Sequence, residues 1–294
     1  MIGDLIHIDS KDGLILHGFH AVEPGRRSSV VIHVHGSYGN FFENFFLEEM
    51  ARSYTQAGVG LLSIGTRGRD YYADFKRKSE GAYSSRRIGG ILEIFQECTL
   101  DLEAWVGFAR DSGYQRIVLQ GHSLGAMKAI YSASRGLKVE GLVLLSPPDN
   151  FGLQERDFGP EWTDFLTSAS TLAQSDSTAL MPSNAYYDPI SSAAFLSLLG
   201  TPTDTGMFTY ADPELMEASG LARIASPVLA TFGTIDEAVV GPVPQCASVL
   251  RSVLQKYTDV DVRIVEGANH PYHFRERELA SVVLSWLESK GFSQ

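Results

Sequence analysis

The feature that most constrains the fold is the sequence Gly-His-Ser-Leu-Gly at residues 121–125. Before it, residues 116–120 form a short apolar run rich in branched side chains, which predicts a buried strand. After it, residues 126–133 are good helix formers that end near Gly136. A serine on such a sharp strand-to-helix turn exposes its hydroxyl, and the flanking glycines avoid clashes with the neighbouring elements. The pattern therefore predicts a nucleophile elbow with Ser123 at its tip, and the alternative is an ordinary glycine turn.

Composition limits the partners of the chain. Its 294 residues carry a formal charge of −11, which argues against nucleic acid and anionic membrane surfaces as partners. No apolar run approaches the roughly 18 residues of a membrane span, and residues 1–7 lack the features of a signal peptide. The two cysteines, Cys98 and Cys246, make no disulfide framework. We therefore expect a cytoplasmic protein with free thiols, whose oligomeric state is left open, a homodimer included.

Strands and helices are predicted to alternate along most of the chain. The predicted strands are residues 5–9, 14–19, 30–34, 59–64, 116–120, 139–145, 227–232 and 260–265. The predicted helices are residues 41–56, with Asn40 as the cap, 90–110, 126–133, 244–256 and 275–288. This alternation requires an α/β fold with a mostly parallel sheet covered by helices on both faces. The first two strands, joined by a turn at residues 10–13, are expected to add an antiparallel edge.

One region interrupts this alternation. Residues 149–222 show no clear strand and carry many Ser, Thr and Pro residues together with scattered aromatic residues. A structureless loop of this length is improbable in a compact domain. We therefore interpret 149–222 as a small helical cap inserted into a core formed by residues 1–148 and 223–294. A disordered insert is the alternative, which the aromatic content disfavours.

A serine nucleophile needs a histidine base and a carboxylate that orients it. If these follow Ser123 in the order acid then histidine, only His270 and His273 lie far enough along the chain. His270 follows the last predicted strand and is therefore expected at the carboxyl edge of the sheet, where sites in such sheets form. Asp236 leaves the preceding strand through a glycine turn toward the same edge. Asp149 is the alternative acid.

An oxyanion formed at Ser123 would need two N–H donors. The backbone N–H of Leu124 is one candidate, since it begins the predicted elbow helix. The other candidate is the backbone N–H of Ser37, in the glycine-flanked turn after the third strand, with that of Tyr38 behind it. Glu237, next to Asp236, is expected to point elsewhere.

Four segments in this order resemble the landmarks of the α/β-hydrolase superfamily, and the resemblance covers almost the whole chain. They are residues 35–37 (His-Gly-Ser), 121–125 (Gly-His-Ser-Leu-Gly), 233–236 (Gly-Thr-Ile-Asp) and 267–270 (Gly-Ala-Asn-His). The resemblance implies an eight-stranded, mostly parallel sheet, a cap after the sixth strand and no cofactor. Within the superfamily the chain looks like the serine carboxylesterases of feruloyl- or siderophore-esterase type.

The chain departs from many relatives after the fourth strand, where a Gly-x-Gly-x-Ser run is replaced by Thr-Arg-Gly-Arg-Asp-Tyr-Tyr at residues 66–72. The segment from Arg67 to Arg87 is rich in cations, which predicts a solvated loop face or, alternatively, a surface that attracts an anionic substrate group. His33 and His35 share one face of a predicted strand, but no carboxylate-rich segment accompanies them, so we expect no metal site.

We interpret the chain as a hydrolase of a carboxylic ester, lactone or thioester, acting through Ser123, His270 and Asp236. A carbon–carbon bond hydrolase, an acyltransferase with the same residues, or a non-catalytic ligand-binding receptor of the same fold are the alternatives. The expected substrate is a medium-sized, partly aromatic or polyketide-like ester or lactone rather than a long triglyceride, because aromatic rings suit flat or bulky acyl groups. The residues expected to bind it are Tyr38, Trp162, Tyr187 and Phe208. In the alternative view, such aromatic residues only hold the cap together.

Overall fold

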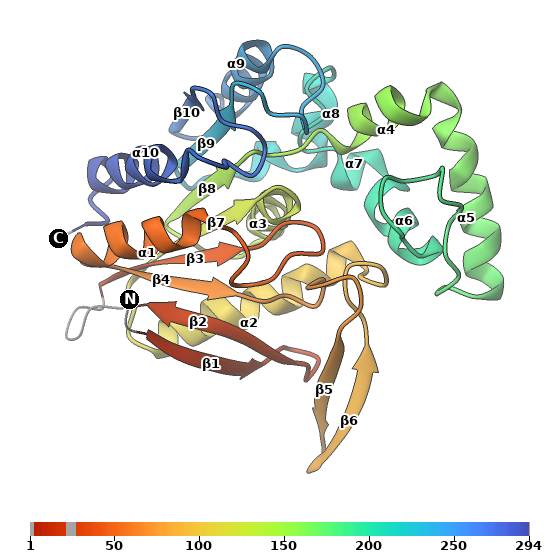
Figure 1. Ribbon diagram of the computed structural model, residues 1–294, viewed down its shortest axis with the longest axis horizontal. Coiled ribbons are helices and arrows are strands. Elements are labelled where there is room, and N and C mark those ends of the chain that lie inside the picture. The colour runs from red at the N-terminus through yellow and green to blue at the C-terminus, as the bar shows by residue number, and fades with distance from the viewer. Residues whose placement is uncertain (1–2, 22–27, 294) are drawn as a thin grey trace.

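A single eight-stranded sheet lies at the centre of the protein, as Figure 1 shows. The computed structural model describes residues 3–21 and 28–293. Met1 and Ile2, the first two residues of the segment expected to lack signal-peptide features, lie outside the described residues. The strand order is β1-β2-β4-β3-β7-β8-β9-β10. The strands are β1 (Gly3–Asp9), β2 (Ile15–Ala21), β3 (Ser29–Val34), β4 (Val59–Ile64), β7 (Arg116–His122), β8 (Gly141–Leu145), β9 (Val228–Gly233) and β10 (Val260–Val265).

Strand β2 pairs antiparallel with β1 and β4, whereas all other neighbouring strands of this sheet pair in parallel. The predicted mostly parallel sheet with an antiparallel edge is therefore confirmed. Strands β3, β4, β8 and β9 are buried along their whole length, which explains why their sequences are apolar without alternation.

Helices cover both faces of the sheet. One face carries α1 (Phe46–Gln56) and α10 (Glu276–Ser289), which lie side by side in Figure 1 and share one apolar core. The other face carries α2 (Cys98–Asp111), α3 (Leu124–Ser134) and α9 (Val243–Leu254). None of the helices among the described residues has the length and apolarity needed to cross a bilayer.

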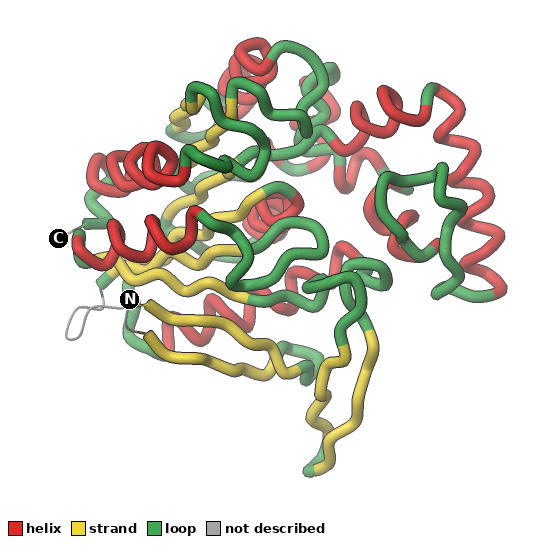
Figure 2. Tube along the Cα trace, in the orientation of Figure 1, coloured by secondary structure: helices red, strands yellow, loops and turns green. Residues whose placement is uncertain are grey.

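The chain between β8 and β9 forms the helical cap, which Figure 2 shows as helices joined by loops. Its elements are α4 (Asn150–Phe158), η2 (Pro160–Thr163), α5 (Asp164–Ser175), α6 (Ser192–Leu199), α7 (Pro202–Thr205), α8 (Pro213–Ser219) and η3 (Leu221–Arg223). Large side chains such as Phe195 and Phe208 are buried within it. The alternative of a disordered insert is therefore wrong, while the exact domain limits at 149 and 222 stay a prediction.

Two predicted helices begin later than expected. Helix α1 begins at Phe46 rather than at residue 41, because polar bonds hold the preceding residues in a loop. The Asn40 carboxamide accepts a hydrogen bond from the backbone N–H of Phe42 (3.1 Å), and the Ser63 hydroxyl donates to the Phe41 carbonyl (2.6 Å). Asn40 therefore stabilises a turn and does not cap the helix. Similarly, α2 begins at Cys98 after the short helix η1 (Phe95–Glu97).

The cationic segment forms a hairpin instead of a loop. Strands β5 (Asp74–Ser79) and β6 (Ala82–Arg87) pair antiparallel and extend away from the main sheet (Figure 1). The two-residue turn between them has positive φ at both Glu80 (43°) and Gly81 (84°), as hairpin turns with the right twist require. The residues of β6 are all exposed, as expected for a solvated face.

Arg67 does not belong to this solvated face. Its side chain is fully buried, and it forms ion pairs with Asp12 (2.9 Å), Glu97 (2.5 Å) and Asp101 (2.8 Å). Burial of a charge is tolerated only where it is paired and hydrogen-bonded, so the three carboxylates account for its position. Arg67 therefore ties the loop after β4 to α2 and to the β1–β2 turn.

Candidate active site

Ser123 lies at the tip of a sharp turn between β7 and α3, as the sequence predicts. Its φ of 56° is rare for a residue with a side chain. A Cβ atom at Gly121 would lie 2.1 Å from the Gly125 carbonyl oxygen, and one at Gly125 would lie 2.2 Å from the Val34 carbonyl oxygen. Neither position tolerates a side chain, because the turn brings the helix onto the neighbouring strand.

The side chains of Ser123, His270 and Asp236 form a continuous series of hydrogen bonds. His270 Nε2 lies 2.8 Å from Ser123 Oγ, and His270 Nδ1 lies 2.8 Å from Asp236 Oδ1. Because a carboxylate only accepts, the Nδ1 proton donates to Asp236 and Nε2 accepts from the serine hydroxyl. Asp236 follows β9 and His270 follows β10, so parallel strands deliver both residues to the edge where β7 delivers Ser123.

The two candidate acids have different surroundings. Burial acts to raise the pKa of Asp236, but its hydrogen bond to His270 and the charge of that ring hold the pKa below its usual value. Burial raises the pKa of Asp149 to about 6. Asp149 caps α4 by accepting from the Gly152 N–H (2.8 Å), and in the described part of the chain it makes no hydrogen bond with His270, whose Nδ1 bonds to Asp236. The geometry thus favours Asp236 as the partner of His270.

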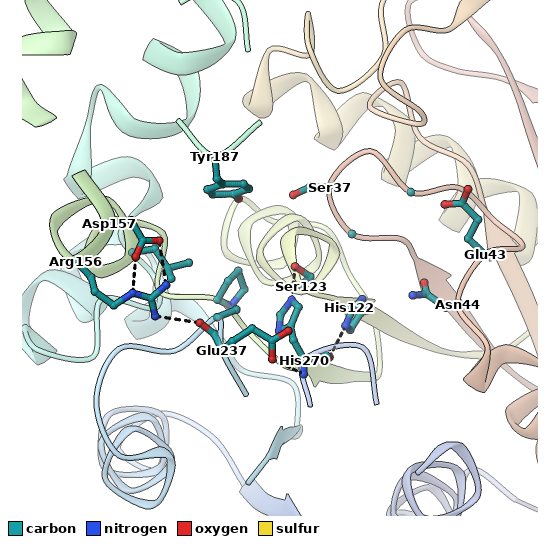
Figure 3. A pocket seen from close by; sticks show the side chains of 15 residues that line it. Ser37, Glu43, Asn44, His122, Ser123, Arg156, Asp157, Tyr187, Glu237 and His270 are labelled. Carbon is teal, nitrogen blue, oxygen red and sulfur yellow. Dashed lines mark hydrogen bonds and ion pairs between the residues drawn. The ribbon is translucent and has the colours of Figure 1, made fainter. Parts of the chain in front are cut away.

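Two further side chains hold the backbone of His270, and sequence reasoning missed both. Glu237 Oε2 accepts from the His270 N–H (3.0 Å), although Glu237 was expected to point elsewhere. His122 Nε2 donates to the His270 carbonyl (2.9 Å), and Figure 3 shows both contacts. Burial and the nearby His270 lower the pKa of His122 to about 3, so it is neutral. The position of His122 beside Ser123 in the Gly-His-Ser-Leu-Gly sequence was the available signal.

The predicted oxyanion turn lies against the elbow. A Cβ atom at Gly36 would be 3.1 Å from the Cβ of Ser123, and the Gly39 N–H closes the turn on the Gly36 carbonyl (3.3 Å). The backbone N–H groups of Ser37 and Leu124 donate no hydrogen bond within the described residues. Leu124 is the first residue of α3, where helix N–H groups lack an internal partner.

A cavity of about 400 Å³ opens above Ser123 and His270; we call it the site cavity. Figure 3 shows Tyr187 and Arg156 on one side of it and Glu43 on the other. Arg156 is paired with Asp157 (2.6 Å), which also lines the site cavity. No residue between Arg67 and Arg87 is among its described lining, so the cationic hairpin does not form an anion site here.

Of the four residues predicted to bind substrate, only Tyr187 lines the site cavity. The prediction for Trp162 and Phe208 is corrected by the structure: both are buried, and they pack on Phe151 and Tyr210 respectively. Sequence alone could not separate aromatic residues of the cap core from those facing the site, because Trp162 lies in the short helix η2 and Tyr187 and Phe208 lie in loops, where no helical period indicates the buried face.

Tyr38 is part of the oxyanion turn, but its side chain does not line the site cavity. Its hydroxyl donates to the Pro189 carbonyl (3.1 Å), and its ring stacks on Tyr71 with centroids 4.6 Å apart. Gly90 accommodates this ring, because a Cβ atom there would be 2.4 Å from it. Tyr38 therefore connects the oxyanion turn to the cap rather than contacting a ligand above Ser123.

The ring nitrogens of His33 and His35 are used in hydrogen bonds inside the protein. His33 accepts from Gln120 (2.9 Å) through Nδ1, and its Nε2 lies 3.3 Å from Asn44 Oδ1. His35 Nδ1 donates to the Gly36 carbonyl (2.8 Å), and Nε2 accepts from the Thr66 N–H (3.1 Å). Among the described residues, no group of three or more His, Cys, Asp or Glu is arranged to hold a metal.

These buried histidines predict that acid destabilises the protein. Burial lowers the pKa of His33 to about 4 and those of His35 and His122 to about 3. Below pH 6.5 the unfolded state binds protons that the folded state does not, so stability falls as the pH falls. At pH 5.5 each histidine costs about 1.4 kcal/mol, or about 4 kcal/mol together. Urea denaturation at pH 8 and pH 5.5 measures the difference; equal stability at both would contradict the prediction.

Comparisons with known proteins agree with this architecture. The model of the alpha/beta hydrolase family matches residues 31–282. A search of curated protein sequences finds no match.

Solved structures resemble the chain over nearly its whole length. Siderophore hydrolase EstB from Aspergillus fumigatus is similar with a TM-score of 0.70 and 16% identity, covering 99% of this chain and 98% of that one. Est1E from Butyrivibrio proteoclasticus, solved with bound ferulic acid, has a TM-score of 0.65 and 16% identity, covering 97% and 98%. The Pyrococcus furiosus esterase Pf2001 has a TM-score of 0.61 and 19% identity, covering 98% and 91%. At these identities the similarity shows the fold.

Proposed function

Because the chain belongs to the alpha/beta hydrolase family, we propose that this hydrolase cleaves a carboxylic ester, lactone or thioester with Ser123 as its nucleophile. The observation that carries the proposal is the hydrogen-bonded series from Ser123 through His270 to Asp236, with both bonds at 2.8 Å. A serine hydroxyl becomes nucleophilic when an adjacent base takes its proton and a third group orients that base.

In the proposed reaction, His270 Nε2 takes the proton of Ser123 as its Oγ attacks the substrate carbonyl carbon. The N–H groups of Leu124 and Ser37 stabilise the negative charge on the carbonyl oxygen. His270 then protonates the leaving alcohol or thiol, which departs from the acyl-enzyme. Water, deprotonated by His270, then attacks the acyl carbon. The bond between this carbon and Ser123 Oγ breaks, His270 returns the proton to Oγ, and the carboxylic acid is released.

Asp236 stabilises the imidazolium that forms in each half of this reaction. Its carboxylate is kept ionised by the contact with His270 described above. Glu237 and His122 bind the backbone N–H and carbonyl of His270, so they fix the main chain from which the ring projects, while Asp236 orients the ring itself. Preorganisation of this kind reduces the reorganisation that the reaction itself would otherwise require.

The charges of the site cavity favour an uncharged substrate. Arg156 and Asp157 neutralise each other, which leaves the carboxylates of Glu43 and Glu237 as the net charge of the lining. A substrate that carries its own carboxylate is repelled by about 1 kcal/mol for each such charge at short distance.

The ferulic acid bound to Est1E and the siderophore hydrolase activity in the name of EstB support an ester of medium size with an aromatic part.

Kinetics with matched p-nitrophenyl esters test this proposal. We expect the valerate ester to be hydrolysed, and the monoanionic glutarate ester to have a kcat/KM about tenfold lower at low ionic strength, because of the repulsion described above. In the Glu43→Gln variant, kcat/KM for the glutarate ester should lie closer to kcat/KM for the valerate ester than it does in the wild type. As a control, Glu103→Gln removes a carboxylate on the exposed surface of α2 and should leave the ratio unchanged. Preference for the anionic ester would contradict the proposed substrate class, and no hydrolysis of any ester would contradict the proposed function.

A further inference from the structure

A second cavity, of about 570 Å³, lies beside the site cavity and is larger. We call it the aromatic cavity, because four phenylalanine rings line it: Phe19, Phe41, Phe42 and Phe45. Leu47 and Leu61 add aliphatic surface to its walls. Ligand sites are typically concave, mostly apolar and of 300–1,000 Å³, so both size and lining suit a small molecule.

The aromatic cavity exists because α1 begins five residues later than its sequence predicts. In a helix beginning at residue 41, Phe41, Phe42 and Phe45 would be arranged around the helix. Instead these three residues occupy a loop that faces Phe19 of β2 across the cavity, and Phe42 and Phe45 are 68% and 69% exposed. Clustered exposure of large apolar side chains is unfavourable in water and commonly marks a binding site. The exposure of Phe42 and Phe45 therefore indicates a binding site.

Asn44 is the residue that lines both cavities. Figure 3 shows it beyond His122, on the side of the site cavity opposite Arg156. A buried series of hydrogen bonds fixes its carboxamide: the Tyr54 hydroxyl donates to Gln120, Gln120 donates to His33, and the His33 ring lies 3.3 Å from Asn44 Oδ1. With its oxygen fixed in this way, the amide NH₂ of Asn44 donates no hydrogen bond within the described residues.

We propose that the aromatic cavity binds the distal, uncharged aryl group of the substrate, whose chain passes over Asn44 from the carbonyl carbon at Ser123. This inference rests on the proposed function. Asn44 lines both cavities, and their position next to each other argues for the substrate as occupant. The phenylalanine rings suit a flat apolar group, and stacked or edge-to-face contacts with such rings add to the effect of burial. Glu43 lines the site cavity and Glu48 lines the aromatic cavity. Both carboxylates disfavour a group that carries a negative charge of its own.

Kinetics with short and aryl-tailed esters test the proposal. The substrates are p-nitrophenyl acetate, p-nitrophenyl 6-phenylhexanoate and 6-phenylhexyl acetate, so that the phenyl tail is carried on either the acyl or the alcohol side. In Phe42→Ala and Phe45→Ala we expect KM for the better aryl-tailed ester to rise about tenfold, since the lost contact is hydrophobic. The change in KM for p-nitrophenyl acetate should be much smaller, because this ester carries no six-carbon tail with a distal phenyl group. Tyr83→Ala, which removes an aromatic ring of 67% exposure from the β5–β6 hairpin, is the matched control.

Three outcomes would overturn the inference. The first is an unchanged KM for both aryl-tailed esters in both phenylalanine variants. The second is an equal loss for the short and aryl-tailed esters. The third is a change in oligomeric state without a change in kinetics, which would assign the two rings to contact with a second copy of the chain.

A binding measurement separates this inference from the proposed function. Equilibrium dialysis of N-methyl-6-phenylhexanamide, a neutral and non-ester probe, should give a Kd about tenfold higher for Phe42→Ala than for the wild type. This result would support the aromatic cavity even if no ester is hydrolysed. An unchanged Kd, with esters hydrolysed normally, would overturn the cavity assignment and leave the proposed function standing.

Discussion

Replacing Ser123 by alanine is expected to lower kcat/KM for ester hydrolysis by roughly 10⁴–10⁶-fold, because the variant has no group that can form the acyl-enzyme. The structure gives this serine alone a hydroxyl bonded to His270 Nε2 among the described residues. A fluorophosphonate should therefore add one covalent label to the wild type, at Ser123, and none to the variant. Peptide mapping by mass spectrometry identifies the labelled residue, and p-nitrophenyl acetate kinetics measure the loss.

Ser252→Ala provides the control for this experiment. Ser252 is exposed on α9, where its hydroxyl bonds to the Val249 carbonyl (2.8 Å) and to no other described residue, so its removal should affect neither labelling nor turnover. Labelling of a serine other than Ser123, or hydrolysis by Ser123→Ala at more than a few per cent of the wild-type rate, would show that the nucleophile lies elsewhere.

Residues set by short-range constraints could be placed from the sequence. Ser123, Asp236 and His270 each follow a strand whose apolar run is easily recognised, and parallel strands must bring their carboxyl ends to one edge. The crowding measured at Gly121 and Gly125 is likewise local, because the turn itself creates it. The fold class and the three proposed catalytic positions therefore follow from the chain order of strands, turns and helices.

Features that depend on side-chain partners far along the chain could not be placed. The sequence predicts the start of α1 five residues too early. Ser63, 22 residues away, donates a hydrogen bond to the Phe41 carbonyl and keeps the segment before Phe46 in a loop. Arg67 looks like a surface cation until three distant carboxylates are brought around it. Glu237 was expected to point away, yet the loop after β10 delivers the His270 N–H to its carboxylate.

The β5–β6 hairpin was missed for a different reason. Phe75 is its one large apolar residue that is buried, so the segment lacks the apolar alternation that normally predicts strands. The Glu-Gly turn at residues 80–81 was the remaining signal.

The role of Asp236 is best tested by removing its charge while keeping its shape. In Asp236→Asn we expect kcat to fall by about 10³–10⁴-fold, because an amide can hold His270 in the wrong tautomer and cannot stabilise the imidazolium. In Asp149→Asn we expect a loss of less than about threefold, since asparagine caps a helix as well as aspartate does and the cap bond to Gly152 can be kept. Turnover of p-nitrophenyl acetate measures both, with thermal unfolding to verify that each variant folds.

The comparison between these two variants decides which carboxylate orients the base. Both carboxylates are largely buried, and Asp149 has its pKa raised to about 6, so burial or an unusual pKa alone would not separate them. What separates them is the 2.8 Å bond from His270 Nδ1, which only Asp236 makes among the described residues. A large loss of turnover in Asp149→Asn, with near-normal turnover in Asp236→Asn, would identify Asp149, which follows β8, as the acid that orients His270. Equal, small losses in both would mean that His270 acts without a carboxylate partner, and the proposed mechanism would then need a different source of orientation for its base.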